Sequence, residues 1–154
     1  MIIYRKRDCC KPSRRFHNAT KNDPKLFIEI YASEKNMINE IGKAYTRPWG
    51  TYQTLALAKN YQIKIITVNP GGRLSLQKHS KRSEHWVVVA GSPTITIDET
   101  VKTYQVNDHV FIPIGTAHRM ENFTTVAAII TEVQIGPYLG EDDIIRLDDV
   151  YGRV

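Results

Sequence analysis

Short runs of alternating hydrophobic and polar residues follow one another through most of the chain after residue 50. Such runs, rich in Val, Ile, Thr and Tyr, are typical of strands, and Gly/Pro clusters such as Pro70-Gly71-Gly72 separate several of them. About eight short strands with no helical pattern between them favour an antiparallel sandwich or barrel, most simply a jelly roll. The predicted strands are Thr51–Ala58, Tyr61–Asn69, Arg73–Gln77, His85–Ala90, Thr94–Asp98, Lys102–Val106, His109–Ile112 and Val126–Val133.

The segments on either side of these strands have a different pattern. Residues 24–42 carry apolar residues at three-to-four spacing, with Asp23 as a candidate N-cap and Gly42 as a candidate stop, which predicts a helix. The charged tail from Gly140 to Val154 predicts one helical turn followed by a tail that folds back on the body. We therefore divide the chain into an N-terminal extension, residues 1–44, and an all-β domain, residues 45–154.

The charge of the chain is concentrated in its first residues. The net charge is +5, but residues 1–21 carry seven basic residues and one acid, so the remaining residues sum to −1. A basic balance suggests an anionic partner, yet here the excess belongs to an arm and not to the folded body. A solvated arm is the simpler interpretation, and nucleic-acid binding through it is the weaker one.

The cysteines and the apolar segments indicate the compartment. Cys9 and Cys10 are adjacent, and a bond between neighbouring cysteines is strained, so we expect two reduced thiols. Met1 to Tyr4 runs straight into charged residues, which is unlike a signal peptide. No window approaches the roughly 18 apolar residues of a membrane span. We expect a cytoplasmic protein that does not enter a membrane.

Four side chains that could hold a metal ion lie at the ends of predicted strands. Gln77 and His79 share one strand face, because residues i and i+2 do so, and Glu84 begins the next run after a short basic loop. His118 follows the turn at residues 113–117. Two imidazoles, a carboxylate and an amide oxygen suit Zn²⁺, Mn²⁺, Fe²⁺ or Co²⁺, and spacing alone does not choose among them.

The other histidines have simpler interpretations. His85 neighbours Glu84 and should therefore point to the opposite face of the same strand, away from the site. His17 and His109 are read as ordinary surface or core residues. Trp49 and Trp86 are expected in the core, because a Trp side chain buries a large area.

Two ordered motifs resemble those of the cupin superfamily. The first is Gly72-x6-His79-x4-Glu84-x6-Gly91, with Gln77 where many cupins have an earlier histidine. The second is Pro113-x-Gly115-x2-His118-x3-Asn122, with Asn107 in place of the leading glycine. This resemblance implies a cupin double-stranded β-helix, a form of jelly-roll barrel.

A closer resemblance is to type II mannose-6-phosphate isomerase, and it covers about residues 45–153. In that family the module is usually the C-terminal part of a bifunctional enzyme whose N-terminal part is a mannose-1-phosphate guanylyltransferase. Residues 1–44 match nothing in the resemblance, and the chain has no room for the transferase domain, so we carry over only the isomerase. The motifs are Arg47-Pro48-Trp49-Gly50-x-Tyr52, Leu74 to Gly91, Ile112 to Arg119, Tyr138 to Arg146, and Asp149-x-Tyr151-Gly152-Arg153.

The resemblance implies interconversion of mannose 6-phosphate and fructose 6-phosphate, feeding GDP-mannose and polysaccharide biosynthesis. Gln77, His79, Glu84 and His118 would hold one divalent metal ion, with Zn²⁺ first and Mn²⁺, Co²⁺, Fe²⁺ and Mg²⁺ open. Glu84 is also the nearest carboxylate for a general base, although a metal-bound carboxylate is a weak base; His118 and a metal-bound water are alternatives.

The phosphate of a sugar-phosphate substrate needs cations, and arginine suits it best. Arg82, two residues before Glu84, and Arg146 in the tail are ranked first, with Arg153 next. Arg82 and Arg146 are also counted, with Glu84, among the catalytic residues.

Other functions stay open from the sequence. One is a different sugar-phosphate isomerase or epimerase with the same metal site. Another is a non-catalytic cupin that binds sugar or drives oligomerisation for a separate nucleotidyltransferase. We expect a homodimer, since cupins commonly pair sheet edges or faces.

Overall fold

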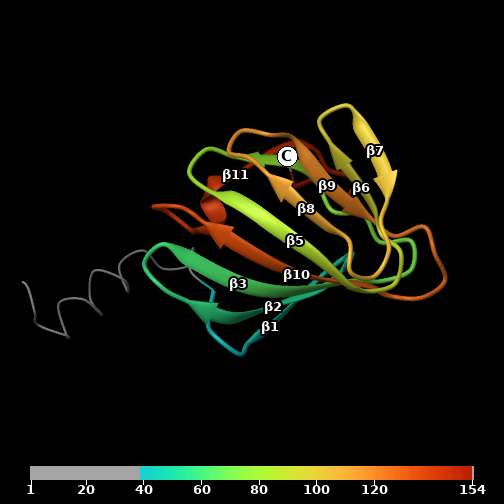
Figure 1. Ribbon diagram of the computed structural model, residues 1–154, viewed down its shortest axis with the longest axis horizontal. Coiled ribbons are helices and arrows are strands. Elements are labelled where there is room, and N and C mark those ends of the chain that lie inside the picture. The colour runs from blue at the N-terminus through green and yellow to red at the C-terminus, as the bar shows by residue number, and fades with distance from the viewer. Residues whose placement is uncertain (1–38, 154) are drawn as a thin grey trace, which may run out of the picture. The chain divides into compact units, whose positions relative to one another are not determined.

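The computed structural model describes residues 39–153, and this part of the chain is almost entirely β-structure (Figure 1). No helix in this range has the length and hydrophobicity needed to cross a bilayer. The elements are β1 (Ala44–Arg47), β2 (Gly50–Leu57), β3 (Tyr61–Val68), β4 (Leu76–His79), β5 (Ser83–Ala90), β6 (Thr94–Ile97), β7 (Thr100–Thr103), β8 (His109–Ile112), β9 (His118–Glu121), β10 (Ala128–Ile135), the short 3-10 helix η1 (Glu141–Asp143) and β11 (Ile144–Asp148).

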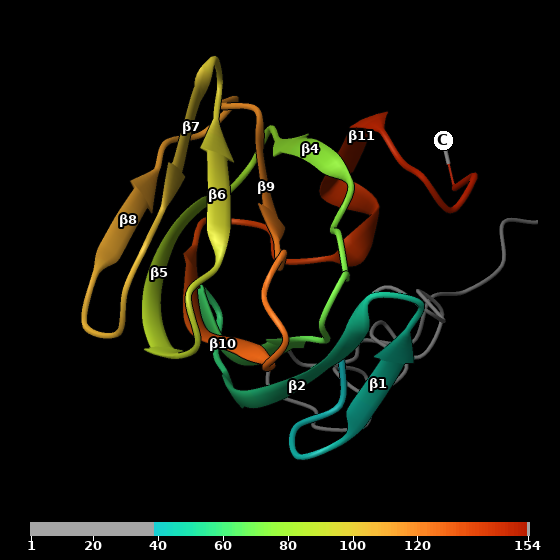
Figure 2. The same cartoon turned by 90° about the vertical axis from the view of Figure 1, so that its right-hand side faces the viewer.

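The strands form two antiparallel sheets that curve around a common interior (Figure 2). One sheet has the order β1-β2-β3-β10-β5-β8, and the other has the order β11-β4-β9-β6-β7. Strands distant in sequence are therefore neighbours: β10 lies between β3 and β5, and β4 lies between β9 and β11. This non-sequential order is that of a jelly-roll barrel, and it confirms the all-β fold predicted from the sequence.

The interior of the larger sheet changes character along its strands. Buried and partly exposed residues alternate on β3, β5 and β10, because successive side chains of a strand point to opposite faces. At one end the inward residues are apolar, as in the neighbouring set Ile66, Ile130 and Val88. At the other end they are polar, and the buried residues there are Gln62, Lys64, Arg82, Glu84, Glu132 and Gln134. The barrel therefore has a hydrophobic core at one end and a polar interior at the other.

Most predicted strands are present at nearly the predicted positions. His109–Ile112 is β8 as predicted, and β2, β3, β5, β6 and β10 agree with the prediction to within about two residues at each end. The strand predicted at Arg73–Gln77 lies further along, as β4, and the one predicted at Lys102–Val106 lies earlier, as β7.

Three strands were not predicted. β1 and β9 have four residues each, and their sequences, AYTR and HRME, contain no run of apolar or β-branched residues. In the tail, a 3-10 turn at Glu141–Asp143 is present, but it is followed by β11 and not by an irregular tail. β11 pairs with β4 and so extends the smaller sheet. A charged strand of this kind is stabilised by its neighbour, and its own residues carry no clear signal.

The helix predicted for residues 24–42 lies outside the described residues except for its last four. Those four include an isolated bridge between Ile41 and Thr54 and a turn at Gly42, with no helix. The basic arm, Cys9 and Cys10 also lie outside the described residues.

One departure from the cupin motif has a backbone explanation. Asn107 has φ +74°, in the left-handed region where glycine is favoured and asparagine is the best-tolerated alternative. Its N–H donates to the carbonyl of Val88, which joins the turn to β5. Asn107 therefore performs the conformational role of the glycine that the motif usually has.

Candidate functional site

Two histidines and a glutamate meet inside the polar end of the barrel. His79 ends β4, Glu84 lies near the start of β5 and His118 begins β9; each is 2% exposed or less. One ligand atom of each lies within 4.8 Å of the others. His79 Nε2 is 3.1 Å from Glu84 Oε1, and His118 Nε2 is 3.5 Å from Glu84 Oε2. Three of the four side chains selected from the sequence are therefore together in one cluster.

Gln77, the fourth selected residue, lies beside this cluster. It is the direct cross-strand partner of His118 in the ladder between β4 and β9, and of Arg146 in the ladder between β4 and β11. Its Oε1 accepts a hydrogen bond of 2.9 Å from Ser75 Oγ. One rung of the smaller sheet thus carries Arg146, Gln77 and His118 side by side.

The two imidazoles leave their Nε2 atoms directed at Glu84. His118 Nδ1 lies 2.9 Å from the Thr116 carbonyl, which can only accept, so Nδ1 carries a proton. His79 Nδ1 faces the Asp143 carbonyl at 3.4 Å. Among the described residues neither Nε2 makes a well-formed hydrogen bond, although both atoms are buried and lie 3.1 and 3.5 Å from the Glu84 carboxylate. A divalent cation would satisfy both nitrogens and the carboxylate together, so these residues fit a metal ion.

The carboxylate of Glu84 is held from several sides. Gln134 Nε2 donates to Oε1 at 3.0 Å and Trp86 Nε1 donates to Oε2 at 3.1 Å. Burial acts to raise the pKa of Glu84, but its interactions with His118 and His79 outweigh burial and hold the pKa well below its usual range. A carboxylate with this many partners is a strong candidate ligand and a poor proton acceptor.

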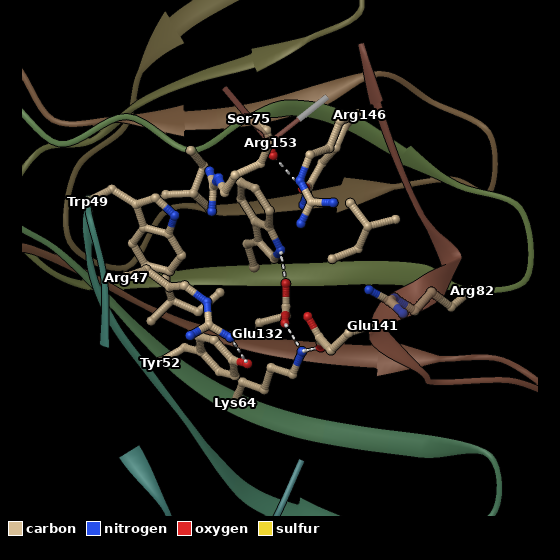
Figure 3. Close-up of a pocket in the computed structure, with 15 residues that line it drawn as sticks. Arg47, Trp49, Tyr52, Lys64, Ser75, Arg82, Glu132, Glu141, Arg146 and Arg153 are labelled. Carbon is tan, nitrogen blue, oxygen red and sulfur yellow. Dashed lines mark hydrogen bonds and ion pairs between the residues drawn. The ribbon is translucent and has the colours of Figure 1, made fainter. Parts of the chain in front are cut away.

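A polar pocket of about 550 Å³, including its open mouth, lies next to this cluster. Figure 3 shows the side chains that line it. Gln77 lines it, and so do Arg82 and Trp86, the two residues on either side of Glu84 that share its face. Five cationic side chains outnumber two acidic ones in its lining, which suits an anionic ligand. The cations are Arg47, Lys64, Arg82, Arg146 and Arg153, and the acids are Glu132 and Glu141.

All three arginines selected from the sequence line this pocket, but they are engaged to different degrees. Arg82 Nη1 donates to the Gly140 carbonyl at 2.7 Å, and its Nε lies 3.4 Å from Glu84. Arg153 is paired with Asp149 through Nε and Nη2, at 2.9 and 2.6 Å. Arg146 Nε is buried and has no hydrogen-bond partner among the described residues. Of these three side chains, Arg146 is the most available to a ligand.

Four charged residues of the pocket were not selected from the sequence: Arg47, Lys64, Glu132 and Glu141. Arg47 lies within the Arg-Pro-Trp-Gly motif, which could have indicated it. Its Nη2 donates to Tyr52 Oη at 3.0 Å, and its guanidinium lies over the Tyr52 ring. Lys64 and Glu132 occupy inward positions of β3 and β10, where a charged residue among apolar neighbours could have been noticed.

Glu132 is a buried carboxyl group beside Glu84. Its Oε1 accepts a 3.0 Å hydrogen bond from Trp86 Nε1, and its Oε2 lies 3.9 Å from Lys64 Nζ. Burial and the charge of Glu84 raise the pKa of Glu132 to about 8, and Lys64 only partly opposes them. Near neutral pH this pocket therefore contains an acid that keeps its proton.

Besides the pairing of β11 with β4, two aspartates hold the tail that supplies Glu141 and Arg146 to the barrel. Asp143 accepts hydrogen bonds from the Ser80 hydroxyl at 2.6 Å and the Lys81 amide at 3.1 Å. Asp148 pairs with Arg119 at 2.8 Å and with Arg73 at 3.3 Å. These contacts fix η1 and β11 against β4 and β9, and they place the tail as one wall of the pocket.

The structure confirms two further assignments of position made from the sequence. His85 is exposed and stacks on Phe111 with ring centroids 4.7 Å apart, so it points away from Glu84. Trp49 and Trp86 are buried in the hydrophobic core cluster. Trp86 also reaches the site, because its Nε1 donates to both Glu84 and Glu132.

Curated proteins similar to this chain are much longer. The chain is 50% identical over 107 residues to the alginate biosynthesis protein AlgA of Pseudomonas aeruginosa, covering 70% of this chain and 22% of that protein. It is 43% identical over 131 residues to a mannose-1-phosphate guanylyltransferase of Salmonella montevideo, covering 85% and 28%. It is 47% identical over 107 residues to the xanthan biosynthesis protein XanB of Xanthomonas campestris, covering 70% and 23%. The chain thus spans about a quarter of these relatives.

Solved structures similar to this one share its fold at low sequence identity. A sugar phosphate isomerase from a cupin superfamily of Silicibacter pomeroyi has a TM-score of 0.52 and 17% identity, covering 66% of this chain and 73% of that one. An oxalate decarboxylase formate complex from Lactobacillus farciminis has a TM-score of 0.59 and 23% identity, covering 68% and 33%. These likenesses confirm the cupin fold and carry nothing about the reaction.

A family model provides the most direct assignment. The model described as "Mannose-6-phosphate isomerase C-terminal" matches residues 33–149, which include every pocket residue named above except Arg153. This match extends over most of the chain and includes all four candidate metal ligands. The chain therefore belongs to the mannose-6-phosphate isomerase C-terminal family, with the cupin fold.

Proposed function

We propose that this chain is a metal-dependent aldose–ketose isomerase that interconverts mannose 6-phosphate and fructose 6-phosphate. The observation that carries the proposal is the buried cluster of His79, Glu84 and His118 beside a pocket with an excess of cations. The family match supports the substrate class. Relatives named for alginate and xanthan biosynthesis support a place in GDP-mannose and polysaccharide biosynthesis. A cytoplasmic location follows as part of the same proposal.

One divalent metal ion would be held by His79, Glu84, His118 and Gln77, with Zn²⁺ first and Mn²⁺, Co²⁺, Fe²⁺ and Mg²⁺ as alternatives. When bound, such an ion polarises a carbonyl oxygen and stabilises the negative charge that develops during enolisation. We assign Glu84 to ligation and not to proton abstraction, because its carboxylate is engaged by Gln134 and Trp86 and its pKa is low.

The phosphate of the substrate would lie among the arginines. Arg146 is the first choice, because its Nε is buried and has no partner within residues 39–153. Arg47 is the second choice, since Arg47 forms no ion pair with an acid in the described chain. Arg153 is third, because Asp149 already occupies one edge of its guanidinium. Arg82 lies closest to Glu84 and would contact the sugar end of the ligand.

The proposal is tested by an isomerase assay of the purified chain. Metal is removed by chelation and returned as Zn²⁺, Mn²⁺, Co²⁺ or Mg²⁺, and fructose 6-phosphate formation from mannose 6-phosphate is measured. Glucose 6-phosphate and ribose 5-phosphate in parallel distinguish a different sugar-phosphate isomerase. Turnover of mannose 6-phosphate with at least one metal is expected, and no turnover with any of them contradicts the proposal.

A non-catalytic module is the second candidate. The observation in its favour is that the chain spans about a quarter of relatives named as guanylyltransferases. In this case the chain would bind mannose 6-phosphate without converting it, and it would co-purify with a separate nucleotidyltransferase. The buried cluster of His79, Glu84 and His118 argues against this second candidate, because a purely structural domain has no need of two buried imidazoles directed at a carboxylate.

We also propose that the chain forms a homodimer through the outer face of its larger sheet. The outward positions of β3, β10, β5 and β8 hold no Lys, Arg, Asp or Glu, and Val87, Val89 and Phe111 are exposed there. An uncharged face can pack on a copy of itself about a two-fold axis without like-charge repulsion. Light scattering after size exclusion should give twice the chain mass, and Val87→Lys should reduce it to one chain mass.

A further inference from the structure

Lys64 is a charged residue in an unusual place. It lies on β3 between the inward residues Gln62 and Ile66 and is only 4% exposed. Lysine is almost never buried in this way unless its charge is paired. Lys64 Nζ lies 2.6 Å from Glu141 Oε1 and 3.9 Å from Glu132 Oε2. Figure 3 shows the side chain reaching from β3 toward these two carboxyl groups, with its tip in the pocket.

The ammonium group of Lys64 has unused donors. An ammonium carries three protons, and within residues 39–153 it makes one hydrogen bond, to Glu141. Glu132, at 3.9 Å, is beyond hydrogen-bond distance. At least one N–H is therefore available to an oxygen of a molecule in the pocket.

Glu141 is fixed in place from outside the pocket. The Oε1 atom that accepts from Lys64 also accepts a 2.9 Å hydrogen bond from Asn39 Nδ2. Asn39 is buried, and its Oδ1 accepts a 3.0 Å hydrogen bond from Tyr52 Oη. Burial acts to raise the pKa of Glu141, but Lys64, Arg82 and Asn39 together outweigh burial and lower the pKa. Glu141 is thus a charged, doubly held acceptor that sets the direction of the lysine side chain.

The neighbours of Lys64 also indicate which part of a substrate it meets. Glu141 carries a negative charge beside it, so a phosphate dianion placed there would be repelled. Arg47 and Arg146 form no ion pair with an acid in the described chain and offer the phosphate a better place. Trp86 joins Glu132, next to Lys64, to Glu84 of the metal cluster. Lys64 Nζ also lies 5.2 Å from the centre of the Tyr52 ring, which Arg47 covers as well. Lys64 is therefore between Arg47 and the residues that lead to Glu84, where a sugar whose phosphate is bound by the arginines would present its oxygens.

We propose that Lys64 is a further catalytic residue, which donates a hydrogen bond to a reacting oxygen of the sugar, and that Glu141, held by Asn39, is the positioning residue that directs it. This inference rests on the proposed isomerase function. A preorganised donor directed at an oxygen that gains negative charge lowers the barrier because it interacts more strongly with the transition state than with the substrate. Lys64 would thus act on kcat more than on KM.

The experiment compares metal-loaded wild type with Lys64→Gln, Glu141→Gln and the double variant. Lys59→Gln is the matched control, since Lys59 is exposed in the loop before the same strand. For each protein kcat and KM for mannose 6-phosphate are measured, together with bound metal and thermal unfolding. Lys64→Met takes the place of Lys64→Gln if the latter does not fold. We expect Lys64→Gln to lower kcat by about 100-fold with KM changed less than about threefold.

The double variant separates positioning from a merely structural role. If Glu141 acts through Lys64, Glu141→Gln lowers kcat in the wild-type background, by roughly 10-fold, and has no further effect when Lys64 is already Gln. If the fold-losses in kcat of the two single variants multiply in the double variant, Glu141 acts independently of Lys64, and its assignment as the positioning residue is overturned. A Lys64→Gln enzyme with wild-type kcat, or with only KM raised, would overturn the assignment of Lys64.

The controls keep this inference distinct from the proposed function. If wild type and Lys59→Gln turn over mannose 6-phosphate and Lys64→Gln has the same kcat, the role of Lys64 is contradicted and the proposed isomerase function stands. No turnover by wild type would remove the proposed isomerase function and the inference with it. Bound metal at the wild-type level in every variant is expected, because none of the substitutions touches the histidines.

Discussion

The two ends of the barrel interior are built by the same three strands and differ only in their inward residues. At the apolar end, Ile130 of β10 lies beside Ile66 and Val88; two residues further along β10, Glu132 lies beside Lys64 and Trp86. The pairing geometry continues unchanged from one set to the next. The comparison shows that one regular backbone arrangement carries both kinds of interior. A step of two residues along the strands leads from the residues that stabilise the core to those of the candidate site.

The largest expected effect is at the polar end. His79→Ala or His118→Ala should abolish metal binding and lower kcat by roughly 10³-fold or more, since each removes one of the converging ligand groups. Elemental analysis and the isomerase assay measure both effects. His85→Ala is the control, because His85 is exposed on the opposite face. Full metal content in both variants would rule out the ligand assignment.

At the apolar end the expected effect is on stability. Ile130 is fully buried, so Ile130→Ala should lower the free energy of unfolding by about 2–5 kcal/mol through lost packing and a residual cavity. Urea unfolding measures this loss. Bound metal per folded molecule should stay at the wild-type level, and a loss of metal would show that the two ends of the barrel are not separable.

A smaller effect is expected from pH, through Glu132. Its pKa is raised to about 8 in the folded protein, against about 4.3 in an unfolded chain, so folding takes up a proton between these values. The contribution of Glu132 to stability is therefore fully present below about pH 4.3 and is lost as the pH rises toward 8, at up to about 1.4 kcal/mol per pH unit. The amide of Glu132→Gln does not titrate, so this variant does not lose stability in this way as the pH rises.

Urea unfolding of metal-free wild type and Glu132→Gln from pH 5.5 to 8.5 measures the difference. The variant should gain stability relative to wild type as the pH rises. A constant difference across the range would mean that Glu132 is charged throughout and that its raised pKa is wrong.

The smallest effect is expected from the ion pairs of Asp148, which connect the tail to the barrel. Asp148 pairs with Arg119 and Arg73 at an exposed edge, where ion pairs contribute about 0–1 kcal/mol. Asp148→Asn should therefore change stability by less than about 1 kcal/mol. Because β11 carries Arg146, the variant should raise KM for mannose 6-phosphate by a few-fold with kcat unchanged. Unchanged KM would show that these pairs do not position Arg146.

The residues that the sequence identified and those it missed differ in a physical way. His79, Glu84 and His118 could be selected because they lie at strand ends next to recognisable turns, and short turns constrain where strand ends meet. Lys64 and Glu141 could not be paired in advance, because 77 positions separate them and only the folded tail brings them together.

The same reasoning explains the elements. β8 was predicted at its observed bounds because two turns delimit it, whereas β11 depends on its cross-strand contacts with β4. Asn39 was placed in an extension before residue 45, yet its amide bonds to Glu141 and Tyr52. Register and tertiary contact, which a single sequence does not display, decide both cases.

The position of β11 at the edge of its sheet has a consequence for how a bound molecule leaves. Edge strands exchange their amide hydrogens faster than central ones, because they open by local fraying without unfolding the rest. Arg146 lies on this edge strand, while Gln77 and His118 lie one and two strands further in on the same rung. On the proposed function, fraying of this one strand would withdraw Arg146 from the phosphate and leave His118 in place, so product departure and metal retention would be governed by different local stabilities.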